Sequence, residues 1–322
     1  MFQFRDRLYK FLKDWMLVIG MAAGAGIYLI YHAIPALHSA GPLLESCCKT
    51  IQPVMLFLML FLAFCKIEPN QLRPHKWQGW LLLIQGSLFI ILALILVIFK
   101  GIDNPVILES LMLCLICPTA TACAVVTGKL GGDMAGVVGY TVLINILVSL
   151  LVPTFVPLIH PIEGMTFASA FSRIIAKVFP LLIMPCMLAW VVRYIFPTVH
   201  ARMLKYTWLS FYIWALSLTI AILMSTRAIV HSRAGISIIL GIAAVSAASC
   251  LFQFWAGKRI GKPYNHGITA GQALGQKNTV FGIWMGYTFL DPVSSIACGF
   301  YSIWHNLYNT RQLHEAGSYR RE

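Results

Sequence analysis

The chain of 322 residues is 59% hydrophobic and only 11% charged, and its mean hydropathy is +0.79. Soluble domains carry roughly 25% charged residues, so this composition excludes an ordinary soluble domain. The formal charge of +13 would suggest nucleic-acid binding in a soluble protein. In a membrane protein, Lys and Arg instead gather in cytoplasmic loops and set the topology. We therefore expect an all-α polytopic membrane protein that lies in the lipid bilayer and binds no nucleic acid.

The N-terminal residues 1–14 alternate charged and apolar side chains and contain no small-residue cleavage site. This pattern favours a cytoplasmic amphipathic lead-in over a signal peptide. Because about 20 apolar residues cross a bilayer, the rest of the chain predicts ten membrane spans and a cytoplasmic tail at 309–322. The sixth span is expected to bend near Pro180 and Pro185. The expected spans are 15–31, 51–65, 77–99, 105–127, 134–159, 171–196, 206–224, 235–256, 264–290 and 292–307.

The positive charges of the loops are unevenly shared between the two sides of the membrane. With ten spans and a cytoplasmic N-terminus, most of the 24 Lys and Arg residues fall in cytoplasmic segments. The positive-inside rule therefore predicts that both termini are cytoplasmic. We expect a multi-pass protein of the cytoplasmic (inner) membrane.

Two polar breaks interrupt the fourth and ninth spans, at 117–124 and 271–279. In lipid, freed backbone groups are tolerated only where they are buried in protein or line a water-filled cavity. Paired breaks in corresponding positions of two halves indicate a transport site near the bilayer midplane. Five spans in each half predict two inverted repeats, 15–160 and 161–308, with the broken helix fourth in each.

The residues in the breaks suit an ion or substrate site. At the first break, Pro118 lacks a backbone donor, whereas Thr119 and Thr121 offer hydroxyl groups. The second break places Gln276, Lys277, Asn278 and Thr279 in one turn, and such polarity inside a span is expensive unless it faces a cavity. Lys277 lies near the middle of its span, so that snorkelling to the interface is a poor explanation for it.

Other polar residues have simpler interpretations. Asp133 is expected to cap the fifth span, and Asp291 to cap the tenth beside Pro292. Glu109 is expected near a membrane boundary, although a pairing with Lys277 stays open. His305 and Asn306 are interpreted as structural.

The chain also lacks the patterns of enzymes and metal proteins. Most of the nine cysteines lie in apolar segments as packing residues, and Cys114 and Cys117 lie in a helix with no second cysteine pair. No HExxH or GxSxG motif occurs, which argues against a membrane-embedded enzyme. We expect no cofactor and no structural metal.

Three segments resemble the bile acid:sodium symporter family. Residues 117–135 are similar to the fourth-helix crossover of that family, Cys-Pro-Gly-Gly-Thr-Ala-Ser-Asn-Val-Val-Thr followed by Gly-Asp-Val-Ala. Residues 273–278 are similar to its ninth-helix motif, Glu-Val-Gly-Met-Gln-Asn, and 300–306 to its close, Phe-Ser-Val-Trp-His-Asn. The resemblance implies ten helices in a core and a panel domain, with broken helices four and nine crossing beside sodium sites. It also implies an amphipathic organic anion as substrate.

The departures from the family pattern fall on its sodium ligands. A Ser-Asn pair becomes Cys123 and Ala124, a glutamate becomes Ala273, and a glutamine becomes Lys277. In the fifth helix, Thr141 aligns with a retained ligand, whereas Val137 replaces a hydroxyl residue. Gln85 matches a family sodium-site glutamine. Sodium therefore becomes doubtful as the coupling ion.

These changes favour a lysine in the role of the bound cation. A protonated Lys277 would repel sodium by several kcal/mol at the effective dielectric of a buried site. We expect its ammonium group to replace sodium and to donate to Gln85 and to carbonyl groups of the crossover. Burial disfavours a charged amine, so proton coupling is possible; an ion-independent uniporter or exchanger is equally open. A membrane solute sensor of the same fold that has lost transport is the alternative function, and the oligomeric state stays open.

Overall fold

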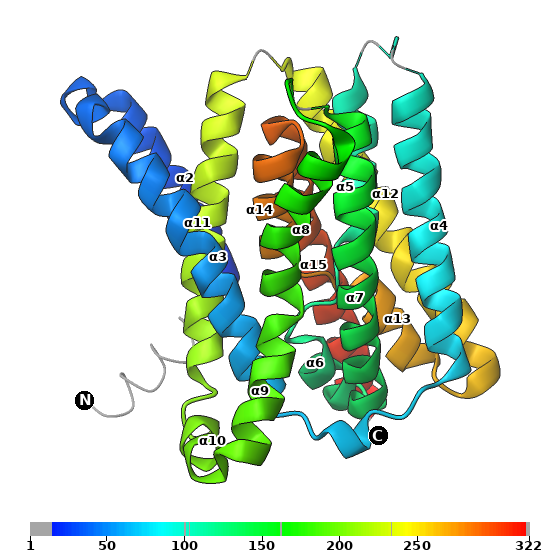
Figure 1. Cartoon of the computed structure of the whole chain (residues 1–322). Coiled ribbons are helices and arrows are strands. Elements are labelled where there is room, and N and C mark those ends of the chain that lie inside the picture. Colours follow the sequence, from blue (N-terminus) through cyan, green and yellow to red (C-terminus); the bar gives the residue numbers. More distant parts are fainter. Residues whose placement is uncertain (1–14, 100, 103, 162, 233, 320–322) are drawn as a thin grey trace.

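The computed structural model describes residues 15–99, 101–102, 104–161, 163–232 and 234–319 (Figure 1). These residues are almost entirely helical, and the only β-type pairing among them is one isolated bridge. The expected lead-in, 1–14, lies outside the described residues. The described α-helices are α2 (Met16–Ala33), α3 (Gly41–Cys65), α4 (Lys76–Ile98), α5 (Pro105–Ile116), α6 (Cys123–Lys129), α7 (Met134–Ile159), α8 (Phe167–Leu182), α9 (Met184–Ile195), α10 (Pro197–Leu204), α11 (Leu209–His231), α12 (Ile236–Gly261), α13 (Gly267–Gly275), α14 (Thr279–Phe289) and α15 (Ile296–Tyr319). Four short 3-10 helices join them: η1 (Pro35–Ala40), η2 (Pro69–Gln71), η3 (Lys262–Tyr264) and η4 (Pro292–Ser295).

Length and hydropathy support several membrane crossings. Five of the described segments are long and apolar enough to cross a membrane; they contain α3, α4, α7, α11 and α12. The pair α8–α9 makes a sixth if its two helices form one bent span, with a bend of 42°. This bend lies between Pro180 and Pro185, as the sequence predicts. The expected ten spans thus coincide with helices, but only five or six of them satisfy this criterion by themselves.

Some helices extend beyond the expected spans. The helix α3 begins at Gly41 rather than near residue 51, and so includes Glu45 and Lys49, which lie outside the expected span. The helix α10 was not expected. It starts with Pro197 at its first position, where the backbone N–H of any residue lacks an intrahelical partner, so that proline costs no hydrogen bond there. The helix α15 continues through 309–319, where Asn309 and Gln312 accept hydrogen bonds from Gln272 at 2.9 Å each.

Both expected helix breaks are present but shorter than expected, because 123–124 belong to α6 and 271–275 to α13. The first separates α5 from α6 at 117–122, and the second separates α13 from α14 at 276–278. Pro118 cannot continue the hydrogen bonds of α5 because it has no N–H. At the second break, Asn278 accepts a hydrogen bond from the backbone N–H of Phe281 and so caps α14.

The helices form two groups that meet along α7, α8, α11 and α14 (Figure 1). In one group, α11 packs against α2 and α3, and α3 packs against α9. In the other, α12 packs against α5, α13 and α15, while α4 packs against α5 and α7. We call the end at which α4, α7 and α11 end the upper end, and the end with 66–75, 130–133 and 262–266 the lower end (Figure 1). The short helix α13 lies in the lower half and α14 in the upper half.

Close packing holds α13 in place. A Cβ atom added to Gly257 on α12 would come within 2.4 Å of the carbonyl oxygen of Ala270, and one added to Gly275 would come within 2.4 Å of the ring of Phe254. The two glycines therefore allow α12 and α13 to approach more closely than larger residues would. This contact fixes the end of α13 from which the second break starts.

Candidate functional site

The two breaks cross each other in the middle of the protein. Thr119 and Lys277 form an isolated antiparallel bridge. The N–H of Ala120 donates to the carbonyl oxygen of Gln276 at 2.9 Å, and the N–H of Asn278 donates to that of Pro118 at 2.8 Å. The hydroxyl group of Thr119 also donates to the carbonyl oxygen of Ala273 at 2.8 Å. Backbone groups that lack a helical partner at one break thus form hydrogen bonds with the other break.

Side chains satisfy the carbonyl groups at the end of α5. The ammonium group of Lys277 donates to the carbonyl oxygen of Leu115 at 3.4 Å. The side-chain amides of Gln253 and Gln85 donate to the carbonyl oxygens of Cys114 and Cys117, at 3.3 and 3.1 Å. A cation at the C-terminal end of a helix is electrostatically favourable because the helix dipole is negative there. Lys277 therefore caps α5 through its terminal amino group.

Lys277 is almost completely buried. Its side chain is 1% exposed. The thiols of Cys114, Cys117, Cys123 and Cys298 are among the ionisable groups in its surroundings, and the sulfur atoms of Cys117 and Cys298 lie 3.6 Å apart. No carboxylate forms an ion pair with Lys277 among the described residues. The hydrogen bond described for its amino group is thus the one to the carbonyl oxygen of Leu115.

Gln85 and Lys277 do not bond to each other as the sequence suggested. Gln85 donates to Cys117 and accepts a hydrogen bond from the hydroxyl group of Tyr140 at 2.8 Å. Both of its side-chain groups are therefore engaged, and Lys277 is left with the carbonyl oxygen of Leu115. The two residues lie at the same helix end and cap different carbonyl groups.

The second break contains buried polar atoms without a partner. Gln276 and Asn278 are each 4% exposed, and the Oε1 atom of Gln276 and the Nδ2 atom of Asn278 have no hydrogen-bond partner. The hydroxyl group of Thr279 bonds to that of Ser302 on α15. A buried polar group without a partner costs free energy, so these two atoms are candidates to contact a bound solute.

The remaining candidates are dispersed around the crossover. Thr121 is half-buried in the first break, whereas Cys123 is buried with its sulfur atom 4.0 Å from the hydroxyl oxygen of Thr127. Thr141 donates to the carbonyl oxygen of Val137 in its own helix at 2.9 Å. Ala124, Val137 and Ala273 offer no side-chain oxygen at this site.

Glu109 lies deeper than expected and pairs with a different partner. It is 1% exposed, and its carboxylate bonds to Nε2 of His160 at 2.9 Å and accepts from the backbone N–H of Asp291 at 3.1 Å. The hydrogen bond to Glu109 raises the pKa of His160 above its usual 6.5, although partial burial opposes this shift. Glu109 therefore holds segments of the upper end together and does not pair with Lys277. Asp291 also caps η4 through the N–H of Val293 at 2.8 Å, beside Pro292 as expected.

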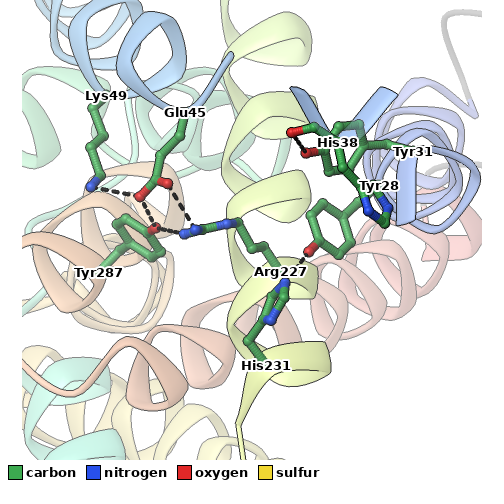
Figure 2. Close-up of polar contacts among 8 residues, drawn as sticks. All are labelled: Tyr28, Tyr31, His38, Glu45, Lys49, Arg227, His231 and Tyr287. Carbon is green, nitrogen blue, oxygen red and sulfur yellow. Dashed lines mark hydrogen bonds and ion pairs between the residues drawn. The ribbon is translucent and has the colours of Figure 1, made fainter. Parts of the chain in front are cut away.

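A polar network at the upper end links the two helix groups, and sequence reasoning missed it (Figure 2). The hydroxyl group of Tyr287 on α14 accepts from Arg227 on α11 at 2.7 Å and donates to Glu45 on α3 at 3.2 Å. Glu45 also pairs with Arg227 at 2.8 Å and with Lys49 at 2.7 Å. On the other side of Arg227, Tyr28 bonds to His231 at 2.7 Å (Figure 2). Its charged residues, Glu45, Lys49 and Arg227, lie outside the expected spans, so that hydropathy gave no signal for this network.

Comparison with known families identifies the chain. The model of the sodium bile acid symporter family matches residues 53–233, which is more than half of the 322 residues. The chain belongs to this family. Comparison with curated proteins gave no match.

Membership of the symporter family defines the general class of the protein. It is an integral, multi-pass membrane transporter for small organic substrates and not an enzyme. The matched region includes the first break and ends before the second, which contains Lys277. The crossover is thus composed of one break inside the matched region and one outside it.

Proposed function

We propose that the protein is a secondary transporter of an amphipathic organic anion, in which Lys277 takes the place of a bound sodium ion. The observation that carries this proposal is the hydrogen bond from the Lys277 ammonium group to the carbonyl oxygen of Leu115. A cation is thereby positioned at a helix end inside the crossover, where the family couples transport to sodium. Ala124, Val137 and Ala273 remove side-chain oxygens that sodium would need.

The substrate anion binds beside the crossover. The N-terminus of α14 begins at Thr279 and offers partial positive charge to an anion. The unpartnered side-chain atoms of Gln276 and Asn278 lie in the same turn, and Thr121 is half-buried in the first break. An amphipathic carboxylate or sulfonate would match this combination of polar atoms and apolar helix surface.

Transport proceeds by alternating access between the two helix groups. The ten expected spans form two inverted repeats of five, and both termini lie on the cytoplasmic side of the inner membrane. The lower end is then cytoplasmic. The Tyr287 network connects α14 to α3 and α11 at the opposite end. This is consistent with a conformation that is closed on the side away from the cytoplasm. Opening of that end requires these contacts to separate.

The coupling ion can be tested by flux in proteoliposomes. A labelled bile acid is added outside, and the sodium and proton gradients are varied independently. We expect uptake that does not respond to sodium; a response to the pH gradient indicates proton coupling, and no response to either indicates a uniporter or exchanger. Binding of the bile acid without flux under any gradient would instead support a sensor that has lost transport.

A further inference from the structure

Three helices begin at one point of the lower end, and each presents a metal-ligating side chain there. His75 precedes α4, Asp133 precedes α7, and His266 precedes α13. The candidate ligand atoms of these three residues all lie within 4.8 Å of one another. We propose that His75, Asp133 and His266 form a binding site for one divalent transition-metal ion of the zinc type.

The distances within the cluster suit a shared ion better than direct hydrogen bonds. The Oδ2 atom of Asp133 lies 3.6 Å from Nε2 of His75 and 4.0 Å from Nδ1 of His266. An N–H···O hydrogen bond would bring such atoms to about 2.7–3.2 Å. Two ligands of one zinc ion, each about 2.0–2.2 Å from the metal, stand roughly 3–4 Å apart. The three side chains therefore face a common point without bonding to one another.

The backbone around the three ligands is held in position by hydrogen bonds between the same segments. The N–H of His75 donates to the side chain of Gln78 at 2.9 Å, and Gln78 in turn donates to the carbonyl oxygen of Gly136 on α7 at 2.9 Å. The N–H of Asp133 donates to the hydroxyl group of Thr269 on α13 at 2.9 Å. The geometry is thus preformed, and metal binding requires only small side-chain rotations.

Two tight turns and one aromatic side chain orient the ligands. Asn265 has a positive φ of 59° directly before His266, and Gly131 has a φ of 81° two residues before Asp133. The ring of the buried Trp77 lies against those of His75 and His266, with centroid distances of 6.0 and 5.9 Å. Trp77 therefore restricts both imidazole rings from one side.

The site is open to solvent, and the types of its ligand atoms favour some metals over others. The three side chains are 24–31% exposed, so that an ion can enter, and Asp133 and His266 also line a surface hollow of about 640 Å³. Two imidazoles and one carboxylate suit zinc and its neighbours, whereas calcium and magnesium prefer oxygen ligands. Lys262 lines the same hollow, and the three helix N-termini are partially positive. These charges weaken binding but do not change the preference for nitrogen ligands.

A bound ion would connect three helices that surround the crossover. His266 starts α13, and α13 leads directly to the second break. On the α4 side, Trp77 contacts Tyr140 with a centroid distance of 6.1 Å, and Tyr140 bonds to Gln85 at the first break. Metal binding would therefore stiffen the lower end of the helix group that contains Lys277. This role is independent of which substrate the protein carries.

Metal titration of the full-length protein in detergent tests the site. Protein stripped with a chelator is titrated with Zn²⁺, and Co²⁺ is added in parallel because its visible absorption reports nitrogen ligation. We expect about one ion per chain, a visible Co²⁺ band, and a rise in the unfolding midpoint with Zn²⁺, because a ligand that binds only the folded state stabilises it. Ca²⁺ and Mg²⁺ should have no such effect.

Variants separate this site from other histidines. His266→Ala and Asp133→Asn should each lower zinc affinity at least about 10-fold, since even changes beside the ligands cost about 10–100-fold. His38→Ala, at an exposed histidine of the upper end, is the matched control and should bind like the wild type. The proposal is overturned if stripped wild type shows no Co²⁺ band and no stoichiometric zinc binding, or if His266→Ala binds as tightly as His38→Ala. The wild-type Co²⁺ band and zinc stoichiometry test the proposal even if a variant fails to fold.

Discussion

The backbone of Thr119 pairs with that of Lys277, 158 positions later in the chain, in the one β-type bridge among the described residues. This pairing brings an ammonium group to the C-terminal end of α5, where Lys277 bonds to the carbonyl oxygen of Leu115. Two helix breaks that are individually costly thereby compensate each other. The crossover combines fixed backbone geometry with a buried lysine.

Gln85 is predicted to be a major contributor to stability. Gln85→Leu removes the donor to Cys117 and the acceptor for Tyr140, leaving two buried groups without partners. We expect a loss of about 2–5 kcal/mol, since one unpaired buried group costs about 1–3 kcal/mol. Thermal unfolding in detergent measures the change. The control is Gln52→Leu, because Gln52 is also buried but its Nε2 atom has no hydrogen-bond partner. Equal destabilisation by the two variants would contradict the assigned role.

Gly257 is predicted to be intolerant of a larger side chain. In Gly257→Ala the new Cβ atom would approach the carbonyl oxygen of Ala270 to 2.4 Å. Such overpacking costs about 1–3 kcal/mol, and it would shift α13 and weaken both stability and transport. Gly79→Ala in α4 is the control, because nothing lies within 4 Å of its added Cβ. A Gly257→Ala protein with wild-type unfolding and uptake would show that the close approach is not required.

The hydroxyl group of Tyr287 is predicted to hold the upper end closed. Tyr287→Phe removes its hydrogen bonds to Arg227 and Glu45 and keeps the ring beneath Lys49. We expect a cysteine introduced at Asn104, which lines the hollow next to Tyr287, to react faster with an external thiol reagent in this background. Tyr194→Phe, at an exposed tyrosine on α9, serves as the control. An unchanged labelling rate would mean that the ion pairs of Glu45 close this end without Tyr287.

The pair of Glu109 and His160 predicts a pH dependence of stability. The hydrogen bond to Glu109 raises the pKa of His160 in the folded protein above 6.5, with a further contribution from Asp291. Stabilisation by protonated His160 is therefore complete below about pH 6.5 and is lost as the pH rises through the folded pKa. The unfolding midpoint should fall between pH 6 and pH 8.5, and His160→Gln should reduce this fall while His38→Gln should not. A midpoint in His160→Gln that falls as much as in the wild type would contradict this explanation.

The sequence was sufficient to predict the helix breaks but not the partners of their side chains. Pro118 and the polar cluster at 276–279 mark the breaks directly, because proline and a run of polar residues are incompatible with an uninterrupted span. The partners of three carbonyl groups come from segments that are distant in the sequence. Lys277 donates to Leu115, Gln85 to Cys117 and Tyr301 to Gly275. Pairings such as Glu45 with Arg227 require the packing of α3 against α11, which hydropathy does not specify.

Whether Lys277 replaces sodium is tested by the sodium dependence of uptake in the wild type and in Lys277→Ala. Both proteins are reconstituted in parallel at equal pH on the two sides, with either sodium or potassium outside and a labelled bile acid as substrate. If Lys277 replaces sodium, wild-type uptake is equal in the two salts and Lys277→Ala loses at least about tenfold, which corresponds to roughly 1.4 kcal/mol of lost interaction. Uptake that a sodium gradient drives in the wild type, and that persists in Lys277→Ala, would contradict it.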